Sequence, residues 1–133
     1  MIGLDTNVLV RYFAQDDARQ GAAARRLLQT GLTREAPGHV NVVTLAETCW
    51  VLERLYAAGR GELVQIVENL LATPNIVVER KGVVRKALQA FDAAPAAGFS
   101  DCLIAQLNAD AGCSHTATFD KSASRIAGFE LLA

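Results

Sequence analysis

Short apolar runs and helical stripes alternate along the chain. The apolar runs predict strands, since buried parallel strands are nearly continuously hydrophobic, at residues 1–4, 39–43, 75–79, 115–119 and 129–132. Apolar side chains three to four residues apart predict helices between them, at residues 6–13, 17–28, 44–58, 62–71, 83–94 and 100–111, with Gly59 as the stop of the third. The predicted order is a strand and two helices, three times over, followed by a strand, a seventh helix in the segment between residues 119 and 129, and a last strand.

Polar residues at the predicted helix starts indicate how these helices are capped. Thr44 and Glu47 have the spacing of a capping box. Ser100 is expected to cap the helix that it begins. Asp5 and Asp120 each follow a predicted strand and can cap what comes next.

The alternation of strands and helices predicts an α/β fold. We expect three α/β/α layers around a central, mostly parallel sheet of about five strands, with right-handed crossovers. The chain has 133 residues, about the length of one domain, and no repeat, low-complexity tract or linker interrupts it. Residues 1–133 are therefore expected to form a single domain.

The composition excludes several classes of protein. Hydrophobic residues make up 51% of the chain, and a mean hydropathy of +0.20 excludes a disordered, solvating polypeptide. The longest stretch without a charged residue covers 11 residues, 36–46, and a membrane crossing needs about 20. No basic residue precedes Arg11, which argues against a secretory signal. We expect a cytoplasmic protein with no membrane segment.

Charge and metal-binding side chains narrow the chemistry further. The formal net charge is −1 and no run of Lys or Arg exceeds two residues, so phosphate contacts alone are not expected to hold a nucleic acid. This charge is compatible with an enzyme that contacts nucleic acid through a bound metal cation. Two isolated His argue against a zinc site or a Ser-His-Asp triad. Cys49, Cys102 and Cys113 lack Cys-x-x-Cys spacing and are expected to be buried thiols.

Four of the 14 acidic residues lie beside predicted strand ends: Asp5, Glu47, Asp101 and Asp120. The carboxyl ends of parallel strands meet at one edge of a sheet, so these side chains are expected to converge there. Taken singly, each acid is better explained as a helix cap or a first-turn acid than as a site residue. Their apolar neighbours favour a shared site, because clustered carboxylates repel one another and lose hydration. A divalent cation would offset both costs.

An all-oxygen ligand set indicates Mg²⁺ or Mn²⁺ rather than Zn²⁺. Such a site activates water and stabilises charge on a phosphoryl group. Four polar residues flank the acids and are expected to orient a water molecule or an acid, with turn or cap duty as the alternative: Thr6, Asn7, Ser100 and Thr118.

The ordered set of acid motifs resembles a PIN domain, and more narrowly a VapC-type toxin of a bacterial toxin–antitoxin pair. The resemblance rests on Asp5-Thr6-Asn7, Thr44-Leu45-Ala46-Glu47, Phe99-Ser100-Asp101 and Thr118-Phe119-Asp120, and covers essentially the whole chain. It implies a Mg²⁺- or Mn²⁺-dependent endoribonuclease with the four acids as its catalytic quartet and Asp5, Asp101 and Asp120 as metal ligands. It also implies a homodimer and a VapB-like antitoxin that occludes the site. One departure is Ala123, where many relatives have an aromatic residue.

Two other functions are open at this stage. A phosphohydrolase of the haloacid-dehalogenase kind would use Asp5 as nucleophile with Lys121 near the phosphate. Those enzymes usually carry a second Asp two residues on, and this chain has Asn7 there. The other alternative is a PIN-like module that binds without catalysis, although packing four like charges brings a binding module no advantage.

The helices at residues 6–13 and 44–56 carry more large apolar side chains than one helix face can bury: Tyr12, Phe13, Trp50, Val51, Leu55 and Tyr56. This excess predicts either a homodimer contact or an apolar groove for an antitoxin segment. An Arg of that segment would pair with the acidic site. Arg11, one turn or so beyond Asp5, is a candidate phosphate contact, with simple solvation as the alternative.

Overall fold

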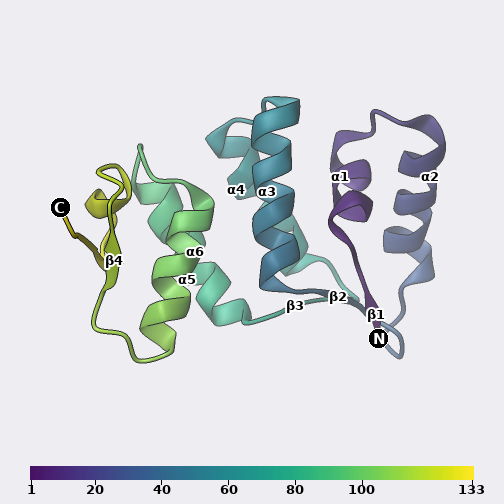
Figure 1. The fold of residues 1–133 in the computed structure, drawn as a ribbon. Helices are drawn as coiled ribbons and strands as arrows, with labels where there is room; N and C mark the ends of the chain where they lie inside the picture. Colours follow the sequence, from purple (N-terminus) through teal and green to yellow (C-terminus); the bar gives the residue numbers. More distant parts are fainter. The chain divides into compact units, whose positions relative to one another are not determined.

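Residues 1–133 are all described by a computed structural model, and they form two contiguous units, Met1–Glu79 and Arg80–Ala133. Each unit combines helices with parallel strands (Figure 1). The α/β class predicted from the sequence is therefore confirmed. The prediction that residues 1–133 make one domain remains a prediction.

The first unit is built on a three-stranded parallel sheet. Its strands are β1 (Ile2–Gly3), β2 (Gly38–Val40) and β3 (Ile76–Val78), and β2 lies between the other two. Gly38 pairs with Ile2 on one side and with Ile76 on the other. A Cβ at Gly38 would lie 2.8 Å from a Leu32 methyl carbon and 3.0 Å from one of Leu4, so a larger residue would require these two buried side chains to shift.

Two pairs of helices connect these three strands. The elements are α1 (Thr6–Ala14), α2 (Ala18–Arg26), a π-helical turn η1 (Leu27–Gly31), α3 (Val42–Tyr56) and α4 (Arg60–Ala72). Helix α1 packs against both α2 and α3, as Figure 1 shows in purple and blue. The core of this unit consists of aliphatic side chains, with Leu9, Leu45 and Leu63 almost fully buried.

The second unit holds two helices and a small sheet. Its elements are α5 (Lys81–Ala93), α6 (Phe99–Asp110), β4 (Thr116–Thr118), a 3₁₀ turn η2 (Ala123–Arg125) and β5 (Phe129–Leu131). Strands β4 and β5 are parallel, with Thr116 opposite Phe129. Helices α5 and α6 pack together around Phe91 and Phe99, whose rings meet edge to face at 5.7 Å. The five expected strands are thus present as sheets of three and two strands.

The capping residues at three helix ends differ from the sequence prediction. Helix α3 begins at Val42 after an Asn41 cap, so residues 41–43 leave the predicted strand and the Thr44 start is wrong. The helix ends at its C-cap, Ala57, whose φ of 54° lies in the left-handed region. Gly59, the predicted stop of this helix, is instead the N-cap of α4. Helix α6 is preceded by Gly98, so Ser100 is not its cap.

The burial of the cysteines also differs in part from the prediction. Cys49 and Cys102 are buried, as expected, but Cys113 is exposed after the end of α6.

None of the helices combines the length and hydropathy that a membrane crossing requires.

Candidate functional site

Asp5 lies where β1 ends and α1 begins, because its extended backbone (φ −84°, ψ 159°) makes it the N-cap of α1. Its Oδ1 accepts a hydrogen bond of 2.8 Å from the backbone N–H of Thr6. Its main-chain oxygen accepts from Val8 at 3.1 Å and starts the helical ladder. The capping interpretation is correct for this residue, and it occupies only one of the two carboxylate oxygens.

Glu47 is brought to the same place by a side-chain contact with α1. The buried hydroxyl of Thr6 donates a hydrogen bond to Glu47 Oε1, across 41 residues of sequence. The proposed capping box of Thr44 and Glu47 is wrong, because Asn41 Oδ1 accepts from the Thr44 N–H at 2.8 Å. Glu47 therefore lies in the second turn of α3 and points toward α1 instead of back onto its own helix start.

A hollow of about 370 Å³ lies beside this pair, and we call it the acid-lined hollow. Asp5, Thr6 and Glu47 line one part of it, and Val10, Val51 and Leu55 supply apolar lining. Asn7, Arg11 and Tyr56 complete the lining. This small, partly apolar hollow is therefore lined by two carboxylates and by one guanidinium, that of Arg11.

The second unit holds the other two acids as a pair of its own. Asp101 lies in the first turn of α6, half-buried, and Asp120 follows β4. Burial, and after it the negative charge of Asp120, raises the pKa of Asp101 above its ordinary value of 3.8. The two carboxylates are therefore close enough to repel each other.

Asp120 is held by the turn that follows it. Its Oδ1 accepts from the backbone N–H groups of Ser122 at 2.8 Å and Ala123 at 3.2 Å. Its own N–H donates to the hydroxyl of Thr118 at 3.0 Å. Asp120 thus holds the segment that leads into η2, and its other carboxylate oxygen makes no hydrogen bond.

The flanking polar residues divide into two groups. Thr6 donates a hydrogen bond to the Glu47 carboxylate, whereas the Thr118 hydroxyl accepts one from the backbone N–H of Asp120. Asn7 is exposed on α1 and lines the acid-lined hollow with a free amide. Ser100 is half-buried beside Asp101 and makes no hydrogen bond with it.

Arg11 is held in a side-chain network that the sequence did not reveal. Its Nη1 donates to Asp16 at 2.9 Å, and Asp16 also accepts from the Tyr56 hydroxyl at 2.7 Å. These contacts lower the pKa of Asp16, chiefly through the Tyr56 hydroxyl. No local sequence pattern indicates this role of Asp16, because Tyr56 lies 40 residues away.

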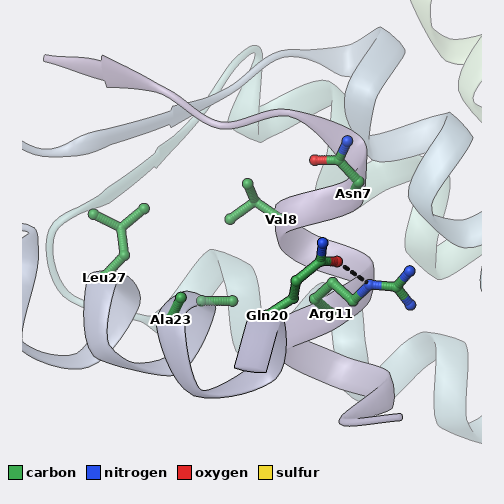
Figure 2. A pocket seen from close by; sticks show the side chains of 7 residues that line it. Asn7, Val8, Arg11, Gln20, Ala23 and Leu27 are labelled. Carbon is green, nitrogen blue, oxygen red and sulfur yellow. Dashed lines mark hydrogen bonds between the residues drawn. The ribbon is translucent and has the colours of Figure 1, made fainter. Parts of the chain in front are cut away.

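A second hollow, of about 510 Å³, lies between α1 and α2, and we call it the α1–α2 hollow (Figure 2). Its polar lining is Asn7, Arg11 and Gln20. Asn7 and Arg11 line both hollows, one turn apart on α1. The ridge of α1 therefore separates the acid-lined hollow from the α1–α2 hollow.

Within each unit the acids occur as pairs, Asp5 with Glu47 and Asp101 with Asp120. Neither unit by itself contains three His, Cys, Asp or Glu side chains placed to hold a metal ion. The sequence-based convergence of all four acids remains a prediction.

Comparison with known proteins relates these pairs to one family. The model of the PIN domain family matches residues 2–129, a stretch that includes all four acids. A search among curated proteins finds no match to this chain.

Proposed function

Because the chain belongs to the PIN domain family, whose fold is of the nuclease type, we propose that it is a metal-dependent endoribonuclease. Asp5, Glu47, Asp101 and Asp120 would act together on a phosphodiester bond of RNA. The observation that carries the proposal is that these acids form two carboxylate pairs, both inside the family match.

The carboxylate chemistry fits a hard divalent cation. Asp5 and Asp120 each commit one oxygen to backbone N–H groups and keep the other for a ligand. Asp101 is half-buried beside a like charge, and a cation would relieve that repulsion. We propose Asp5, Asp101 and Asp120 as the ligands of Mg²⁺ or Mn²⁺. Such a cation, when bound, supplies water activation and charge neutralisation at the phosphate.

The remaining residues have supporting roles in this proposal. Thr6 fixes the Glu47 carboxylate through its hydroxyl, which leaves Glu47 Oε2 to orient a water molecule or a substrate hydroxyl. Thr118 holds the backbone that carries Asp120. Apolar side chains, among them Val10 and Val51, line the acid-lined hollow together with these acids.

We propose further that the chain is a toxin of the VapC type, with a VapB-like antitoxin as partner and a homodimer as its assembly. The motif resemblance supports this, as do the exposed apolar side chains along α3. Val43, Trp50 and Leu55, all on α3, are 73%, 53% and 72% exposed. An antitoxin segment or the second copy would cover them.

The nuclease proposal is tested by cleavage of a labelled RNA with Mg²⁺ or Mn²⁺, with EDTA, and with the metal restored. Asp5→Asn and Asp101→Asn should each reduce cleavage more than about 100-fold, since even loss of a residue behind the ligands typically costs 10–100-fold. Asp92→Asn, at an exposed position of α5, is the matched control and should keep full activity.

Three results would contradict this assignment. Full activity of Asp5→Asn would exclude the acid as a ligand. Cleavage that EDTA does not affect would exclude the metal. A phosphorylated protein after incubation with an aryl phosphate would favour the phosphohydrolase alternative.

The toxin proposal has its own test. The gene is co-expressed with its neighbours, the tagged protein is purified, and growth is followed on expression alone. We expect growth arrest, relief by one small neighbouring protein, and copurification of that protein. If no neighbour copurifies or relieves arrest, the toxin assignment is wrong while the nuclease assignment stands.

A further inference from the structure

Small side chains on α2 create the α1–α2 hollow. The helix reads Ala-Arg-Gln-Gly-Ala-Ala-Ala-Arg-Arg, so four consecutive positions from Gly21 carry at most a methyl group. Helix α1 packs against α2, and space remains over Ala23 between Val8 and Leu27 (Figure 2). The floor of this hollow is apolar and lies beside a polar rim.

The rim offers hydrogen-bonding groups whose orientation is fixed. Arg11 Nε can only donate, and it donates to Gln20 Oε1 at 2.7 Å. The Gln20 amide nitrogen therefore points away from Arg11, toward the side of the hollow where Asn7 and Val8 lie (Figure 2). The two N–H groups of that nitrogen make no hydrogen bond, and the Asn7 side-chain amide makes none either.

The charged groups in its lining also distinguish the α1–α2 hollow from the acid-lined hollow. No carboxylate lines the α1–α2 hollow, whereas Asp5 and Glu47 line the acid-lined hollow across the ridge. The shared Arg11 is anchored by Asp16 through Nη1 and by Gln20 through Nε, which leaves Nη2 without a hydrogen bond. A guanidinium held in this way presents one free edge to a ligand.

We propose that the α1–α2 hollow is a subsite for one unpaired base of the RNA substrate. Arg11 then contacts the phosphate that links this nucleotide to its neighbour at the acid-lined hollow. This inference rests on the proposed nuclease function and identifies where a neighbouring nucleotide binds. A base presents an apolar face and a polar edge, and unpaired RNA is read in that way. The face packs over Ala23 and Leu27, and the edge accepts from the Gln20 amide.

Filling the hollow tests the subsite directly. Ala23→Leu adds three carbons at its floor, and Ala22→Leu makes the same change at the neighbouring position, which is exposed and outside the hollow. Binding of a fluorescein-labelled single-stranded hexaribonucleotide is measured by anisotropy with Mg²⁺, in the Asp101→Asn background. Ala23→Leu should raise the Kd about ten-fold, which corresponds to about 1.4 kcal/mol. Ala22→Leu should change it less than about two-fold.

A second pair of variants guards against a folding defect. Gln20→Leu removes the amide at nearly constant size, and Gln29→Leu does so at an exposed position outside the hollow. Gln20→Leu should weaken binding several-fold and Gln29→Leu should not. Equal Kd values for Ala23→Leu and Ala22→Leu, both folded by circular dichroism, would overturn the subsite.

The outcomes separate the subsite from the nuclease function. If the wild-type protein cleaves no RNA with either metal, the proposed function fails, while a weaker hexamer complex of Ala23→Leu still supports a base site. If Ala23→Leu binds the hexamer normally but releases a copurifying protein partner, the hollow docks that protein and the base subsite is wrong.

Discussion

The hydroxyl of Thr6 and the carboxylate of Glu47 join the first turn of α1 to the second turn of α3. Thr6 is 9% exposed, so this hydrogen bond is shielded from water on the threonine side. Through it the residue that follows Asp5 also sets the direction of the second acid of the pair. One buried hydroxyl thus couples two carboxylates that are 42 positions apart.

Removing this hydroxyl should affect both stability and activity. Thr6→Val keeps the shape of the side chain and leaves Glu47 without its donor, at an expected cost of about 1.5 kcal/mol in the free energy of unfolding. Cleavage should fall about ten-fold or more, because Glu47 is no longer oriented. Urea denaturation and single-turnover cleavage measure the two effects. Thr6→Ser keeps the hydroxyl and should retain most of both, and equal losses in the two variants would contradict an orienting role.

The half-buried Asp101 should make stability depend on pH. Its raised pKa means that, between pH 3.8 and that higher value, the folded state binds more protons than the unfolded state. The free energy of unfolding contributed by this group therefore falls as pH rises through that window. In EDTA at pH 7, Asp101→Asn should be at least as stable as the wild type.

Thermal melts at two pH values check this expectation. The advantage of Asp101→Asn over the wild type should disappear near pH 3, where the wild-type carboxyl is protonated in both states. Asp92→Asn, at an exposed site, should show no such pH-dependent difference. A marked loss of stability for Asp101→Asn in metal-free buffer at pH 7 would instead indicate a structural role.

The cap of α3 gives a prediction about the fold alone. Asn41→Ala removes the acceptor of the Thr44 N–H and should lower the free energy of unfolding by about 1 kcal/mol. Asn41→Asp keeps an acceptor at the same place and should restore most of that loss. Chemical denaturation of the three proteins makes the comparison. Unchanged stability of Asn41→Ala would mean that the helix start does not depend on this cap.

The start of α3 also shows why the sequence predicted the elements better than their ends. Residues 39–43 form an apolar run interrupted only by Asn41, which is typical of a strand. The helix nevertheless begins at Val42, whose N–H donates to Glu79 Oε1 at 3.0 Å. That acceptor comes from the end of β3, 37 residues later. Partners brought by tertiary structure decide such boundaries, and local pattern does not contain them.

The same limit applies to the candidate site. The sequence correctly placed Asp5 and Asp120 after strands, and the half-burial of Asp101 is consistent with its apolar neighbours. The capping-box spacing misassigned Glu47, because that pattern does not include a hydroxyl from α1. Asp16 had no local signal at all, since its partner Tyr56 is fixed by the packing of α1 on α3.

Thiol reactivity should distinguish the three cysteines. Burial, with a smaller effect of Glu53, raises the pKa of Cys49 to about 12, so its reactive thiolate is negligible at pH 8. Cys102 is buried, and Cys113 is exposed. Titration with a disulfide reagent should detect one thiol in the native protein and all three in denaturant. Cys113→Ser should remove the native signal, and rapid modification of Cys49 in that variant would contradict the burial.

The two units are consecutive stretches of the chain, and this order matters during synthesis. A ribosome completes residues 1–79, with their own sheet and core, before it reaches the segment that carries Asp101 and Asp120. N-terminal segments generally fold first as they emerge. If the proposed RNA cleavage needs all four acids, the nascent chain is harmless to the RNA around it until Asp120 has been translated. A growing polypeptide would then pose no hazard to the message that encodes it.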